Sequence, residues 1–168
     1  MAFHDDLLEQ ARHLANRGQR RPRQASLRRA VSAAYYALFH LLVAEGTKSI
    51  RPTAIRRHVR RLYEHGNMKV VCKAWGLGNV ARLSAQTRTL VAGQIEPGLR
   101  AVAAAFVDLQ EARHAADYDL SENFTKVDSL TLVNRASQAF IDWQTVRSVP
   151  NAGVFLAALL FEKQWNKR

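Results

Sequence analysis

The clearest hydrophobic pattern in the chain lies in residues 27–42, which read LRRAVSAAYYALFHLL. At about 100° per residue, one side of the predicted helix is apolar throughout. That side is made of Leu27, Val31, Ala34, Leu38, Leu41 and Leu42. The opposite side carries Arg29, Ala33, Tyr36 and His40. A helix that is apolar over most of its surface is typical of the middle of a bundle, and we expect its polar side chains to face a partner helix or a site, because an unpaired buried cation is unfavourable.

The same helical period recurs along most of the chain and predicts an all-α protein. Besides the helix that begins at about residue 26, we expect helices at 3–16, 53–65, 97–118, 125–146 and 153–165, and shorter helical pieces around 68–75 and 80–91. The pieces between 67 and 97 are the least regular. No run alternates with period two, so we predict a compact up-and-down bundle of five to seven helices.

Breakers and caps mark the ends of several of these helices. The basic segment 17–23, RGQRRPR, stops the first helix. Thr53 is expected to cap the start of the third. Thr125 and Asp128 form an acidic variant of the capping box at the start of the helix at 125–146.

The helix at 53–65 is predicted to separate core residues from cations. Its core stripe consists of Ile55, Val59, Leu62 and Tyr63, and its outer face of Arg56, Arg57, Arg60 and Arg61. The guanidinium group is a planar fork that binds phosphate through two parallel hydrogen bonds and stacks on bases. We therefore predict that these four arginines, together with Arg28 and Arg29, are nucleic-acid-binding residues.

Length and composition are typical of a single-domain protein of the cytoplasm. The 168 residues are enough for one helical domain, predicted to span 1–168 and to end in a basic tail at 163–168. The single cysteine, Cys72, excludes an intramolecular disulfide and a thiolate metal cluster. The longest apolar run, 154–161, is eight residues, far short of the ~20 that cross a bilayer, and the acidic start of the chain does not resemble a signal peptide.

The cations are unevenly distributed along the chain, whose net charge is +11. Residues 1–73 hold fifteen Arg and Lys against five Asp and Glu, whereas residues 74–168 hold ten against nine. Nineteen of the 25 cations are arginine, which favours RNA or DNA as the partner. The alternative is a solvated basic face, which an arginine-rich composition also produces. A sequence-specific DNA-binding protein is disfavoured, because the basic helix has no short turn and recognition helix beside it.

The helix at 97–118 carries charges where its apolar stripe should continue. Val102, Phe106 and Leu109 form the inward stripe, and the next residues along it are Arg113, Ala116 and Asp117. An Arg and an Asp four residues apart form either a structural ion pair or the polar wall of a site.

Two histidines lie near these charges. His114 points about 100° away from the stripe of Arg113. His40, on the polar side of the helix at 27–42, is either a core histidine or part of one cleft with Arg29, Arg113 and Asp117.

The segment LRRAVSAAYYALFHLL, followed some seventy residues later by EARHAADYD, resembles the HEPN superfamily of small helical domains. The resemblance covers roughly residues 7–143 and is to the branch whose late helix ends in Arg, two or three residues, and then Ala-Asp-Tyr. Here these residues are Arg113 and Ala116-Asp117-Tyr118. It implies a helical bundle that forms a homodimer, with the late helix near the two-fold axis.

The resemblance also implies candidate catalytic residues. Many HEPN proteins are metal-independent endoribonucleases of toxin–antitoxin or defence systems, in which an Arg and a nearby His act at a cleft between two copies. Histidine exchanges a proton near neutral pH, and arginine stabilises charge on the phosphate that the 2′-OH attacks. The matching arginine is Arg113, but Asp117 stands where the histidine is usual. His114 and His40 are the histidines that would replace it.

Two functions from different classes follow from this reasoning. One is an RNA-directed ribonuclease of the HEPN type in a toxin or defence system. The other is a catalytically inert HEPN module that binds RNA, a nucleotide or a partner such as a small nucleotidyltransferase. The missing histidine favours the second. No cofactor or metal is expected, since His58 and His65 would lie about 10 Å apart along one helix.

Overall fold

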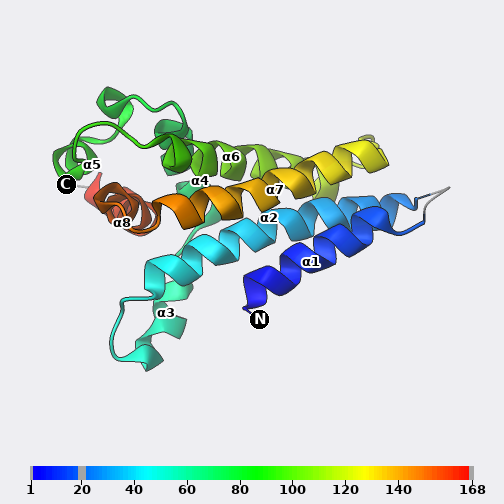
Figure 1. The fold of residues 1–168 in the computed structure, drawn as a ribbon, viewed down its shortest axis with the longest axis horizontal. Coiled ribbons are helices and arrows are strands. Elements are labelled where there is room, and N and C mark those ends of the chain that lie inside the picture. The colour runs from blue at the N-terminus through cyan, green and yellow to red at the C-terminus, as the bar shows by residue number, and fades with distance from the viewer. Residues whose placement is uncertain (1, 19–21, 167–168) are drawn as a thin grey trace. The chain divides into compact units, whose positions relative to one another are not determined.

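The structure is a computed structural model that describes residues 2–18 and 22–166, and in these ranges the chain forms eight α-helices and no strand (Figure 1). The helices are α1 (Phe3–Asn16), α2 (Gln24–Thr47), α3 (Arg56–Arg60), α4 (His65–Gly76), α5 (Ala85–Leu90), α6 (Pro97–Tyr118), α7 (Lys126–Val146) and α8 (Pro150–Trp165). Two 3-10 helices, η1 (Thr53–Ile55) and η2 (Val80–Arg82), precede α3 and α5. The all-α prediction is confirmed, while the expected five to seven helices are too few. No helix in the described ranges is long and apolar enough to cross a membrane.

Contacts group the chain into two compact units. The first unit comprises Met1–Leu41 and Ala105–Phe140, and the second comprises Leu42–Ala104 and Ile141–Arg168. The three boundaries fall inside α2, α6 and α7. One domain over 1–168 stays a prediction, and the last two residues of the predicted tail at 163–168 lie outside the described residues.

The first unit is built around α2. Between residues 30 and 41, every side chain of α2 is buried except Tyr36 and His40, which are half-buried. The ring of Tyr35 packs against Phe106 of α6, with 5.5 Å between ring centroids. A further buried cluster contains Leu27, Val31, Ala116 and Phe124. The predicted helix with apolar sides and one polar stripe is therefore confirmed.

The second unit has an aromatic centre and a buried amide. Trp75 of α4 and Phe155 of α8 are fully buried, with ring centroids 5.0 Å apart. Asn151, at the start of α8, is also buried. Its Oδ1 accepts a hydrogen bond from the Ala92 backbone N–H at 2.9 Å, and its Nδ2 donates to the carbonyl oxygens of Ala92 and Gln94 at 3.0 and 3.2 Å. The start of α8 thus holds the loop that leads to α6.

Several long helices begin and end where the sequence places them. The helices expected at 3–16 and 97–118 are α1 and α6, and the helix expected at 125–146 is α7. Its capping box is present: the Thr125 N–H donates to Asp128 Oδ2 at 2.9 Å, and the Asp128 N–H donates to Thr125 Oγ1 at 3.1 Å. The hydrogen bonds from Thr125 hold the pKa of Asp128 below its usual value. The last helix begins at Pro150 rather than 153, because proline fits the first helical turn.

The predicted helix at 53–65 is wrong. The structure has η1 and the five-residue α3 there, and His65 is the first residue of α4. After α3 the Leu62 N–H bonds to the Val59 carbonyl at 3.0 Å, a tighter turn that ends the 3.6-residue period of the expected core stripe. Ile55 and Leu62 are consequently 43% and 57% exposed. Only Tyr63 of that stripe is fully buried.

Two caps explain other differences in this region. The segment 80–91 is divided into η2 and α5, because Ser84 begins a new helix by accepting a hydrogen bond from the Thr87 N–H at 3.3 Å. Thr53, expected to be an N-cap, lies inside η1, and the capping position is taken by Pro52. The helix expected at 68–75 is α4, which begins three residues earlier.

Candidate functional site

Arg113 and Asp117, one turn apart near the end of α6, form an ion pair with 2.7 Å between Nε and Oδ2. Their side chains are only 19% and 21% exposed. From α2, the Ser32 hydroxyl donates a hydrogen bond to the other carboxylate oxygen, Oδ1, at 2.5 Å. The charges that interrupt the apolar stripe of α6 are thus matched to each other and to a hydroxyl of α2.

Arg113 is also surrounded by tyrosine rings. Its Nη2 donates to the Tyr36 hydroxyl at 2.8 Å, and its Cζ lies 5.4 Å from the Tyr36 ring and 5.5 Å from the Tyr118 ring. Burial lowers the pKa of Arg113, but Tyr36, Asp117 and Tyr118 together outweigh that effect and leave the pKa raised. Arg113 therefore remains a cation at any physiological pH.

Two clefts of the first unit meet at Arg29. One, of about 420 Å³, lies between α1 and α2, and it is lined by Leu7, Gln10, Leu14, Arg29, Ser32, Ala33 and Tyr36. The other, of about 370 Å³, is lined by Ala25, Arg28, Arg29, Ala116, Asp117, Tyr118 and Leu120. Arg29 is exposed, and no described residue forms an ion pair or hydrogen bond with its side chain. It is a cation available to a ligand in either cleft.

Arg28 has a different environment from its neighbour. Its Nη1 donates to the Ala116 carbonyl at 2.9 Å, and its Nη2 donates to the carbonyls of Asp119, at 2.8 Å, and Glu122. These oxygens belong to the last turn of α6 and the loop after it, where a cation also complements the helix dipole. Arg28 therefore holds the end of α6 in place. Its role in nucleic-acid binding stays a prediction, and carbonyl groups already engage its guanidinium group.

The two candidate histidines, His40 and His114, lie in different environments. His40 packs edge-on against Phe3 of α1, with 4.9 Å between ring centroids, and lies 6.3 Å from the Tyr36 ring. His114 is exposed, and its ring lies 5.1 Å from that of Tyr118. Of the four residues expected in one cleft, the structure joins Arg113 to Asp117 and places Asp117 with Arg29, whereas His40 lies against α1.

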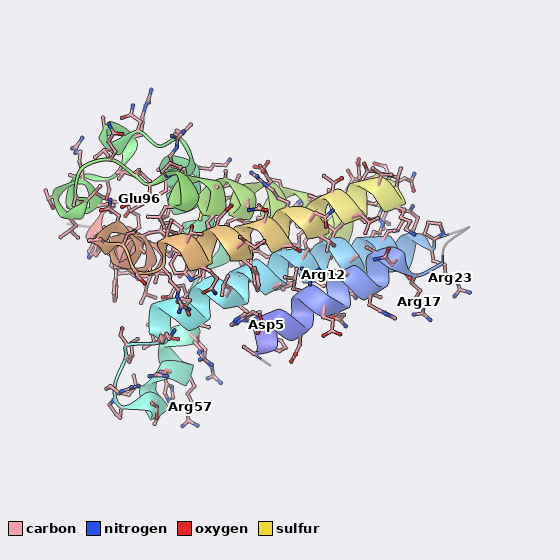
Figure 2. The ribbon with its side chains drawn as sticks, in the orientation of Figure 1. Asp5, Arg12, Arg17, Arg23, Arg57 and Glu96 are labelled. Carbon is pink, nitrogen blue, oxygen red and sulfur yellow. The ribbon has the colours of Figure 1, made fainter. Side chains whose placement is uncertain are left out.

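The predicted basic residues of the second unit fall into two groups. Arg56 is anchored, because its Nε and Nη2 donate to the carbonyls of Ile50 and Lys48 at 3.1 and 2.6 Å. Arg57, Arg60 and Arg61 are exposed, and Figure 2 shows Arg57 pointing away from α3. Arg57 Nε donates a hydrogen bond to Nε2 of its neighbour His58 at 3.1 Å, and Arg60 Nε lies 3.4 Å from the Thr47 hydroxyl oxygen.

Ser32 is the site residue that the sequence interpretation missed. It lies one turn before Tyr36 in α2, as Asp117 lies one turn after Arg113 in α6. A signal was therefore present: the polar stripe of residues 29, 33, 36 and 40 has Ser32 at its edge. The sequence marks Tyr118, whose ring lies beside Arg113, only as the last residue of the motif Ala116-Asp117-Tyr118.

Comparisons with known proteins give no match to a family model, to a curated protein or to a solved structure. Within the described ranges, no three His, Cys, Asp or Glu side chains are grouped so that they would hold a metal ion. The site is therefore defined by its own geometry: a close ion pair, an aromatic cover and, between two clefts, an arginine without a partner among the described residues.

Replacing Arg28 by Lys should lower the free energy of unfolding by about 1–2 kcal/mol, because an ammonium group cannot reproduce the fork that binds three carbonyls. The same change at Arg29, which binds no described residue, should alter it by less than about 0.5 kcal/mol. Urea unfolding followed by circular dichroism measures both. Equal stabilities of the two variants would contradict the role of Arg28 at the end of α6.

Proposed function

We propose that the protein binds RNA, mainly through the second unit, and that it is an HEPN-type module without ribonuclease activity. The observation that carries this proposal is the division of charge between the units. The second unit holds fifteen Lys and Arg against five Asp and Glu, a net charge of +10, whereas the first holds ten against nine. A field of this sign and size attracts the phosphate backbone.

The exposed arginines in α3 and directly after it suit phosphate contacts better than the reading of bases. Arg57 and Arg61 are exposed and bind no backbone carbonyl, so their guanidinium groups are free to reach phosphate oxygens. A helix of five residues is too short to lie along a DNA major groove and present several side chains to base edges. These features favour binding that depends on charge, and the HEPN resemblance favours RNA over DNA.

The geometry of Asp117 supports binding rather than cleavage. One of its oxygens is paired with Arg113 and the other accepts the Ser32 hydroxyl hydrogen bond. Both carboxylate oxygens are thus engaged by side chains of the protein, so Asp117 is poorly placed to exchange a proton with a leaving group. HEPN ribonuclease activity, with Arg113 as the phosphate ligand, is the alternative that the cleavage assay below tests.

We expect single-stranded RNA to bind with a steep salt dependence that requires Arg57 of α3 and Arg61 directly after it. Replacing Arg57 and Arg61 by Ala should reduce the slope of log K against log salt by about 1.4, since each phosphate contact on a single strand contributes about 0.7. The matched control removes the same charge from the first unit, through Arg12→Ala (Figure 2) with Arg135→Ala. Fluorescence anisotropy of labelled RNA measures the slopes, and equal slopes in both variants would exclude α3 from the interface.

A second prediction concerns Arg113 and Asp117 as an internal ion pair. Arg113→Met leaves a largely buried carboxylate without its cation and should lower the free energy of unfolding by about 1–3 kcal/mol. Adding Asp117→Leu should recover most of that loss, and this double variant should bind RNA as the wild type does. Urea unfolding and anisotropy measure the two properties.

The same variants decide between binding and cleavage. We expect the wild type to leave RNA intact in EDTA, even after long incubation. Cleavage to a 2′,3′-cyclic phosphate that survives chelation and disappears in the double variant would falsify the binding-only proposal and establish the ribonuclease.

We also propose that the protein is a homodimer, as the HEPN resemblance implies. Tyr118 and Leu120, at the end of α6, are 64% and 87% exposed, and a second copy would cover them. Light scattering should give the mass of a dimer, and Leu120→Asp should shift it toward the monomer. A monomer at tens of micromolar would contradict the proposal. The small nucleotidyltransferase partner stays a prediction of the resemblance.

A further inference from the structure

The second unit contains a cleft of about 300 Å³ that the RNA proposal does not use. Its apolar walls include Val71 and Trp75 of α4 and Leu83. Its polar lining comes from Arg82, Ser84, Thr87, Glu162 and Asn166. The volume is at the small end of ligand pockets and suits one nucleotide rather than a longer ligand.

Glu162 of α8 carries a buried carboxylate, with the residue only 9% exposed. The Thr87 hydroxyl donates to Glu162 Oε2 at 2.8 Å, and the Ser84 hydroxyl donates to Thr87 Oγ1 at 3.0 Å. The other oxygen, Oε1, has only a 3.5 Å contact with the Asn166 amide. No cation in the described ranges pairs with Glu162. The carboxylate is therefore positioned by hydroxyl groups and keeps unused acceptor capacity, and its residue lines the cleft.

The positive charge of the second unit decides which kind of ligand donor can form a hydrogen bond with the Glu162 carboxylate. An ammonium ligand would have to enter a unit whose net charge is +10. Neutral N–H groups meet no such repulsion, and an anionic group on the same ligand would be attracted. Arg82, which lines the cleft, is exposed and has no side-chain partner among the described residues. The pattern of a carboxylate and an arginine fits a ligand with a neutral donor edge and a phosphate.

We propose that this cleft binds the guanine base of a nucleotide or of unpaired RNA, with the base edge on Glu162 and a phosphate on Arg82. Guanine presents two adjacent donors, N1–H and the 2-amino group, to a carboxylate. Adenine and cytosine place a ring acceptor beside their amino group, and uracil places a carbonyl on each side of its N–H, so all three repel the carboxylate. For RNA as the source of the base, this inference rests on the proposed function.

Isothermal titration calorimetry with the full chain tests the base preference. GMP should bind at least about tenfold more tightly than AMP, CMP or UMP, because a bidentate contact discriminates by that order. IMP, which lacks only the 2-amino group, should bind more weakly than GMP. Equal affinity for GMP and AMP, or for GMP and IMP, would overturn the proposal without any variant being needed.

Two variants assign the contacts. Glu162→Gln keeps an oxygen that can accept the Thr87 hydrogen bond but removes the charge, and it should abolish the preference for GMP over AMP. Glu64→Gln, which removes an exposed carboxylate of the same unit, should leave the preference unchanged. Arg82→Gln should weaken GMP binding about tenfold while leaving guanosine, which has no phosphate, unaffected. A preference retained in Glu162→Gln, or guanosine weakened together with GMP in Arg82→Gln, would contradict the assigned contacts.

RNA binding and guanine binding are distinguishable in this design. If single-stranded RNA binds with the same affinity whether or not it contains unpaired guanine, and GMP has no advantage, the guanine site is wrong and the RNA proposal stands. If GMP binds selectively but no RNA binds, the RNA proposal is wrong and the cleft takes a free guanine nucleotide. Preference for RNA with unpaired guanine that is lost in Glu162→Gln supports both.

Discussion

The burial of α2 is the constraint on which the first unit depends. Between residues 30 and 41, where α2 is almost entirely buried, a polar side chain without a partner would cost free energy. Ser32 and Tyr36 are accordingly bound by Asp117 and Arg113 of α6. The ion pair on α6 therefore serves the packing of α2 first. A ligand could use only the charge and the hydrogen-bonding capacity of Arg113 and Asp117 that their contacts with Tyr36 and Ser32 do not already use.

This priority has a chemical consequence. In a nuclease site, an arginine must be free to follow the developing charge on a phosphate, and a proton donor must stand beside it. Here Arg113 is held by a carboxylate, a phenol and two further rings, and Asp117 is held by Arg113 and Ser32. The arginine of this site that has no partner among the described residues is Arg29 of α2. An ion pair that is already engaged in packing supports the proposed binding function over cleavage.

Sequence patterning predicted the long helices and failed on the short ones for a physical reason. In α1, α6 and α7 several turns repeat the same face, so the periodic pattern averages over individual residues. Between 53 and 65 the chain makes a 3-10 turn, five helical residues and another tight turn. Too few residues then share one helical frame, and Tyr63 alone is buried there while Ile55 and Leu62 are exposed.

The site shows the same limit. The spacing of Arg113 and Asp117 is local, one helical turn, and the sequence identified the pair. Ser32 reaches Asp117 across 85 residues, and Arg28 reaches the carbonyls after α6 across about as many. Such contacts depend on which helices pack together, and the residue pattern within one helix carries no information about its packing partners. A buried polar residue can be recognised from its own sequence neighbours, but its partner comes from the fold.

The two units differ in how they hold a carboxylate of low exposure. In the first unit, where acidic and basic residues nearly balance, Asp117 receives both a cation and a hydroxyl group. In the second unit, which has an excess of ten cations, Glu162 receives a hydroxyl group and no cation among the described residues. An abundance of arginine nearby does not by itself neutralise a carboxylate, since pairing requires a guanidinium group placed within reach. A buried polar group is unfavourable unless it is hydrogen-bonded, so Glu162 favours a ligand that donates hydrogen bonds to it. The positive charge of the unit favours neutral donors, such as the N–H groups of the proposed guanine base.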